Sequence, residues 1–67
     1  MADTPDYKFR PQFCIQELIR EATREAALRR RAYPKWVRAG RMNQKDADKR
    51  IEMMDAIVSR LTRTAGQ

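Results

Sequence analysis

The chain has 67 residues with a formal net charge of +6, a single cysteine and no histidine. One cysteine excludes an intrachain disulfide, and the lack of histidine removes the usual zinc ligand sets and the commonest general base. A chain this short forms one domain with a marginal core, so we predict a single domain over residues 1–67 that is not an enzyme, holds no metal or cofactor, and is stabilised by self-association.

Residues 1–9 are predicted to form a polar N-terminal arm, because Pro5 disfavours helix there. Its aromatic residues, Tyr7 and Phe9, either fray with the terminus or fold back onto the rest of the molecule. Acidic residues stand where a secretory signal would carry bases, and no apolar run is long enough to span a membrane. We therefore expect a cytoplasmic protein without membrane contact.

The first helix is predicted over residues 11–32. Pro11 suits the first helical position, and good helix formers without glycine or proline follow it. Pro34 disfavours helical backbone at the residue before it, which ends the helix near Ala32. At about 100° per residue, one apolar stripe forms, consisting of Ile15, Leu18, Ile19, Ala22, Ala26 and Tyr33.

Residues 33–42 are predicted to connect this helix to the next. Pro34 can start a short helical turn, and Gly40 can supply the left-handed residue that closes it. The connector also carries two aromatic residues, Tyr33 and Trp36.

The second helix is predicted over residues 44–63. Asn43 can cap its first turn, and Asp46 three residues later can reach back as in a capping box. Apolar residues follow with alternating spacings of four and three, which is typical of a seam packed against another helix. These residues are Ala47, Ile51, Met54, Val58 and Leu61.

Two long helices with a short connection predict an all-α fold, an antiparallel two-helix hairpin with a short helical connector. Some apolar residues lie beside the stripe of the first helix or widen that of the second, and one partner helix cannot cover them all. We therefore predict that the hairpin self-associates into a helical bundle or binds a partner through Cys14, Leu28, Ala32, Met53 and Ile57.

Catalytic and metal-binding groups are poorly represented. Cys14 has no histidine to activate it and is predicted to be a small buried apolar side chain. The carboxylates Glu17, Glu21 and Glu25 share one helical face, but arginines surround them, so a solvated face is favoured over a metal site. The spacing predicts pairs of Glu21 with Arg24 and of Glu25 with Arg29.

All of the positive excess lies between residues 26 and 45, a block with no acid. Arginine forks bind phosphates and aromatic rings stack on bases, so this block predicts a site for nucleic acid or a nucleotide. The alternative is that Tyr33 and Trp36 plug the closed end of the hairpin beneath a solvated cap of arginines. The candidate ligand-binding residues are Arg29, Arg30, Arg31, Tyr33, Lys35, Trp36, Arg38 and Arg41.

A resemblance adds a biological setting. The residues that carry it form the stretch REATREAALRRRAYPKWVRAGRMNQKDADKRIEMMDAI, with Tyr33-Pro34, Trp36-Val37 and Gly40-Arg41-Met42 at its centre. This part of the chain, about Arg20 to Leu61, resembles small, mostly uncharacterised helical proteins encoded by phages and prophages of proteobacteria. The resemblance implies no activity. It implies an accessory protein that acts in the cytoplasm of a bacterial host cell, where it would bind DNA, a host enzyme, or a component or signal of a defence system.

Two functions follow from these observations. The first is a binding protein that engages an anionic ligand, either nucleic acid or a small nucleotide such as a defence signal, through the basic connector. The second is a protein–protein effector that inhibits or redirects a host protein, such as a defence component, through its leftover apolar surface. A helix-turn-helix reader of DNA is disfavoured, because Asp46 and Asp48 would face phosphates.

Overall fold

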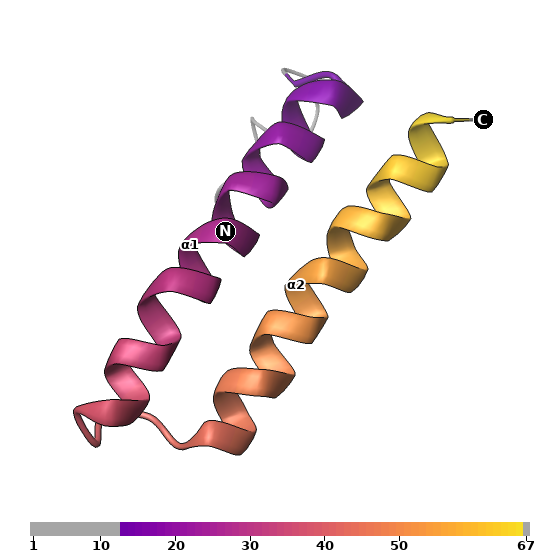
Figure 1. The fold of residues 1–67 in the computed structure, drawn as a ribbon. Helices are drawn as coiled ribbons and strands as arrows, with labels where there is room; N and C mark the ends of the chain where they lie inside the picture. Colours follow the sequence, from indigo (N-terminus) through magenta and orange to yellow (C-terminus); the bar gives the residue numbers. More distant parts are fainter. Residues whose placement is uncertain (1–12, 67) are drawn as a thin grey trace, which may run out of the picture.

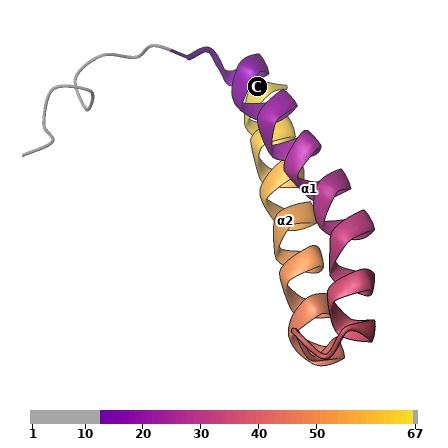
Figure 2. The same cartoon turned by 90° about the vertical axis from the view of Figure 1, so that its left-hand side faces the viewer.

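The computed structural model describes residues 13–66, which form two α-helices and no strand. Helix α1 spans Ile15–Arg38 and helix α2 spans Gln44–Ala65. The helices run side by side in opposite directions, joined at one end by a short loop (Figure 1), and they remain side by side when viewed from a perpendicular direction (Figure 2). The predicted all-α helical hairpin is therefore confirmed.

Helix α1 begins at Ile15, so the predicted start at residue 11 is wrong. Cys14 has extended backbone, and its N–H donates to a carboxylate oxygen of Glu17 at 3.0 Å. This bond is the acidic half of a capping box, which replaces the proline start that the sequence suggested. Cysteine is a rare residue at this position, so the pattern did not mark the boundary. Pro11 lies outside the described residues.

Helix α1 also continues through Pro34 to Arg38, so the predicted end at residue 32 and the connector over 33–42 are both corrected. The proline nitrogen has no hydrogen for the carbonyl of Arg30, and such a residue inside a helix costs about 3 kcal/mol. Tyr33 and Val37 are half-buried on either side of Pro34. Their packing keeps the helix continuous beyond the proline, and the predicted helical turn becomes its last turn.

The loop that joins the helices covers residues 39–43, and Gly40 closes α1 as predicted, with φ of 77°. The Gly40 N–H donates to the carbonyl of Val37 at 3.0 Å, and the Arg41 N–H donates to the carbonyl of Trp36 at 2.9 Å. These two bonds form a Schellman motif, which satisfies carbonyls that the end of the helix would leave open.

Helix α2 begins at Gln44 as predicted and ends two residues later than predicted, at Ala65. The side-chain oxygen of Asn43 accepts from the Asp46 N–H at 2.8 Å, which confirms the cap. The Asp46 carboxylate does not complete a capping box. It instead accepts from the side-chain amide of Asn43 at 3.3 Å.

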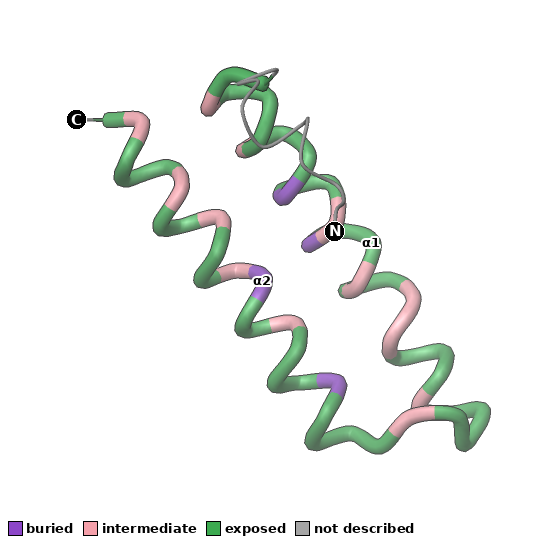
Figure 3. The backbone as a smooth tube through the Cα atoms, turned by 180° about the vertical axis from the view of Figure 1, so that it is seen from behind, coloured by how far each residue is buried: buried purple, intermediate pink, exposed green. Residues whose placement is uncertain are grey.

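The core of the hairpin is narrow. Its buried apolar residues within 13–66 are Ala22, Ala26, Ala47 and Met54, with Val58 and Leu61 packed beside them, and they lie on the facing sides of the two helices (Figure 3). The predicted α2 seam is confirmed. We call the residues of both helices that share this contact the seam; on α1 they are Ile15, Ile19, Ala22, Ala26, Arg29 and Tyr33.

Two residues of α1 differ from the predicted stripe. The α1 seam repeats with spacings of four and three, the pattern of helices that pack along their length. Leu18 directly precedes the seam residue Ile19 and is exposed rather than buried. Arg29 occupies a seam position that a pattern of apolar residues does not predict, because its side chain is charged.

Candidate anion-binding end of the hairpin

Arg29 was predicted to bind a ligand, but its guanidinium group is used inside the hairpin. It donates to Glu25 at 2.9 Å and to the backbone carbonyl of Arg50, on the other helix, at 3.0 Å. Its central carbon lies 5.9 Å from the centre of the Tyr33 ring, within the range of a cation–π contact. These bonds confirm the predicted pair with Glu25 and tie α1 to α2.

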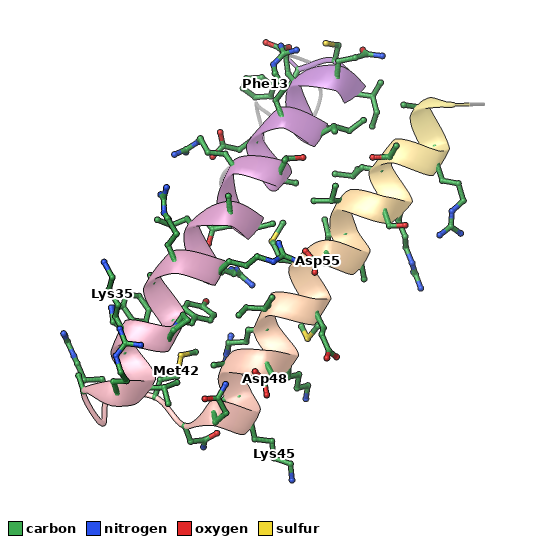
Figure 4. The ribbon with its side chains drawn as sticks, viewed as in Figure 1. Phe13, Lys35, Met42, Lys45, Asp48 and Asp55 are labelled. Atoms are coloured by element: carbon green, nitrogen blue, oxygen red, sulfur yellow. The ribbon has the colours of Figure 1, made fainter. Side chains whose placement is uncertain are left out.

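Arg30 is also bonded to α2 within the hairpin. Its guanidinium forms an ion pair with Asp55 of α2, on one side of the seam. Asp55 points from α2 toward α1 (Figure 4). Sequence spacing could not find this pair, because its members are far apart in the chain and only the packing of the two helices brings them together.

Arg31, Lys35 and Arg38 form an exposed basic stripe on the last turns of α1, with spacings of four and three. Lys35 points away from α2 (Figure 4). Among residues 13–66, no acidic side chain pairs with any of the three. Arg41 in the loop and Lys45 in the first turn of α2 are also exposed. We call these five residues, Arg31, Lys35, Arg38, Arg41 and Lys45, the basic end.

Tyr33 and Trp36 differ in how far each is buried. The rings of Tyr33 and Trp36 lie 5.3 Å apart between centroids with a tilt of 32°. Tyr33 is half-buried at the seam, whereas Trp36 is 44% exposed. Met42 is half-buried and lies between the ends of the two helices, where it helps to close the hairpin (Figure 4). Tyr33 thus packs inward, and the indole keeps a surface that a planar ligand could contact.

The acidic face of α1 is occupied by local bonds. Glu21 and Arg24 form the predicted pair at 2.7 Å, which lowers the pKa of Glu21 and raises that of Arg24. The backbone N–H of Cys14 lowers the pKa of Glu17. Within the part of the chain that the structure describes, no group of three or more side chains is placed to hold a metal ion.

The predicted interface set lies largely at the surface. Leu28, Met53 and Ile57 are exposed, and Ala32 is half-buried. Cys14 is exposed too, so the prediction that it is buried is wrong. It lies just before the first turn of α1, at the open end of the hairpin, where the core has ended.

Neither α1 nor α2 contains an apolar stretch long enough to cross a bilayer. No protein family, curated protein or solved structure matches this chain. The phage-protein resemblance of Arg20 to Leu61 therefore stays a prediction.

Proposed function

We propose that this chain is a small accessory binding protein that holds a phosphate-bearing ligand, either nucleic acid or a small nucleotide, at the basic end of its hairpin. The observation that carries the proposal is the set of five exposed cations at the end of the hairpin that also carries the half-exposed Trp36. This site leaves out two of the residues predicted from the sequence, because Arg29 and Arg30 are bonded within the hairpin.

The charges of the basic end support an anionic ligand. Arg31, Lys35 and Arg38 follow each other at spacings that place like charges side by side on a helix, which is unfavourable without a counter-charge. The negative end of the α1 dipole offsets part of this repulsion near Lys35 and Arg38. A phosphate group would offset more, since guanidinium forks bind phosphate through two hydrogen bonds.

Trp36 favours nucleic acid or a nucleotide over a simple anion. Its side chain is partly open to solvent, and Trp36 stands in the last turns of α1, where Lys35 and Arg38 also stand. An aromatic ring beside cations is the usual arrangement for stacking a base while its phosphate is neutralised. The suggested phage setting makes host nucleic acid or a nucleotide defence signal the first ligands to test.

Fluorescence of Trp36 provides a direct test, because it is the only tryptophan in the chain. The full chain is titrated with single-stranded DNA, single-stranded RNA and a panel of mono- and dinucleotides. We expect a change in emission that saturates with at least one of them and weakens as salt rises from about 50 mM to about 200 mM. Unchanged emission with every ligand at low salt, together with no co-migration in gel shift, would reject the proposal.

A protein–protein effector remains the second candidate function. The observation that favours it is the exposure of Leu28, Met53 and Ile57 at the surface of so small a protein. Apolar contact is insensitive to salt screening, so a host partner held this way would stay bound in a high-salt wash. Retention of a host protein at high salt by the wild type but not by Met53→Lys would favour this candidate over the anionic ligand.

A further inference from the structure

The half-exposed apolar residues of the hairpin all lie on one of its two broad faces. Each directly precedes a seam residue or, for Trp36, the half-buried Val37: Leu18 precedes Ile19, Leu28 precedes Arg29, Trp36 precedes Val37, Met53 precedes Met54 and Ile57 precedes Val58. Arg30 and Asp55, in contrast, directly follow seam residues, and their ion pair marks the opposite face. We call the first set, with the half-buried Ala32, the apolar flank.

The apolar flank is large relative to the core. Its large members are between 42% and 49% exposed, namely Leu18, Leu28, Trp36, Met53 and Ile57. Three of the four buried apolar residues of the seam are alanines, and within residues 13–66 no large side chain is fully buried. Two helices with so small a core need a further source of stability, and packing two such hairpins into a four-helix bundle is the common solution.

The charges around the apolar flank identify the partner as a second copy of the same chain. Residues equally far from the middle of the loop lie at the same height on the two antiparallel helices. Glu21 and Arg60 form one such pair, at 20 and 19 residues from Arg41 in the middle of the loop. Both residues directly precede seam residues, Ala22 and Leu61, so they border the apolar flank.

These paired heights determine one arrangement of the two copies. A two-fold axis parallel to the helices places α1 of one copy over α2 of the other, at equal heights. Glu21 then faces Arg60 of the second copy. Leu28 and Met53 are also at equal height, so they meet across the same contact. A two-fold axis perpendicular to the helices would instead place α1 over α1 and α2 over α2, so Glu21 and Arg60 would lie over different helices.

We infer that the chain forms a two-fold symmetric dimer, a four-helix bundle closed through the apolar flank, with both basic ends at the same end of the bundle. The opposite face, with the Arg30–Asp55 pair, stays in solvent. A symmetric contact of this kind uses the same surface on both copies. The inference does not depend on the proposed ligand, because dimerisation is measured without any anion.

Sedimentation equilibrium of the full chain tests the dimer. We expect a monomer–dimer equilibrium for the wild type and a dimer dissociation constant at least about tenfold higher for Leu28→Lys. Met53→Lys provides a second disruption on the other helix. Ala27→Lys is the matched control, because Ala27 is exposed and lies one residue outside the flank. Circular dichroism establishes that each variant keeps its helices.

A charge exchange tests the orientation. Glu21→Lys should weaken the dimer, and adding Arg60→Glu should restore it, because the two positions meet only between copies. Arg24, the partner of Glu21 within α1, is unchanged in both variants. The dimer is rejected if the wild type stays monomeric at every concentration or forms a larger assembly. A monomer would mean that the apolar flank binds a different protein. Failure of the exchange while Leu28→Lys still disrupts overturns the stated two-fold axis.

Discussion

Arg29 and Arg38 belong to the same basic block, yet their guanidinium groups have different surroundings. Arg29 is bonded to Glu25 and to the carbonyl of Arg50, whereas no acid within residues 13–66 pairs with Arg38. Replacing Arg29 would therefore alter the hairpin itself. Replacing a residue of the basic end should alter ligand binding alone.

Arg38→Gln provides the residue-level test of the basic end. We expect weaker binding of single-stranded nucleic acid and a slope of log affinity against log salt reduced by about one, because one phosphate contact is lost. Lys49→Gln removes the same charge from an exposed position of α2 and is the control. Equal effects of the two substitutions, measured by Trp36 fluorescence, would show that net charge and not the basic end governs binding.

Glu17 provides a pH-dependent test of the start of α1. The Cys14 N–H holds its pKa below the ordinary value of 4.5. A carboxylate with a lowered folded-state pKa stabilises the fold above the unfolded-state pKa and loses this contribution as pH falls through the folded-state pKa. Glu17→Gln should therefore destabilise the protein at about pH 7, and the difference should be smaller at an acidic pH below the ordinary pKa of 4.5. Urea unfolding at both pH values measures it, and an equal difference at both would contradict the cap.

At the scale of the elements, the end of α1 depends on one backbone conformation. Gly40 has φ of 77°, where a Cβ is strained even though no atom lies within 4 Å of it. Gly40→Ala should reduce the free energy of unfolding by about 1–2 kcal/mol. Gly66→Ala is the matched control, since Gly66 has φ of −77° and a Cβ there would make only ordinary contacts. Thermal unfolding of both variants provides the measurement. Equal stabilities of the two variants would disprove the role of Gly40.

Replacing Pro34, in the same helix, should change the free energy of unfolding in the opposite direction. It interrupts the hydrogen bonds of α1 at the carbonyl of Arg30. Pro34→Ala supplies the missing N–H and should raise the free energy of unfolding, by up to about 3 kcal/mol. Urea unfolding provides the measurement. A loss of stability would mean that proline stabilises the protein more by restricting the unfolded chain than it weakens the helix.

At the scale of the whole molecule, the inferred dimer makes stability depend on concentration. Folding and association are then linked, because the bundle buries the apolar flank that one hairpin leaves exposed. The wild-type unfolding temperature should rise with protein concentration, and that of Leu28→Lys should change less. Calorimetry over a wide concentration range measures both, and an invariant wild-type temperature would contradict the linkage.

The dimer would also gather two basic ends at one end of the bundle. A strand of nucleic acid long enough to reach both copies would then bind more tightly than a mononucleotide, because the second contact is intramolecular. The same proximity means that a polyanion should strengthen the dimer. These two effects are expected only if both the dimer and the anion-binding site exist. Sedimentation tests the dimer and Trp36 fluorescence tests the site, so either one can be rejected without the other.

Helical periodicity, the Asn43 cap and the glycine at position 40 were enough to predict two antiparallel helices and the α2 seam, because these signals depend on neighbours within a few residues. Both ends of α1 were predicted wrongly. At the loop end, the local preference near Pro34 was outweighed by the burial of Tyr33 and Val37 in a longer helix. Which arginines remain available was decided by the fold alone. Arg29 and Arg30 find their partners across the seam on α2, and no rule of spacing within one helix can bring those atoms together.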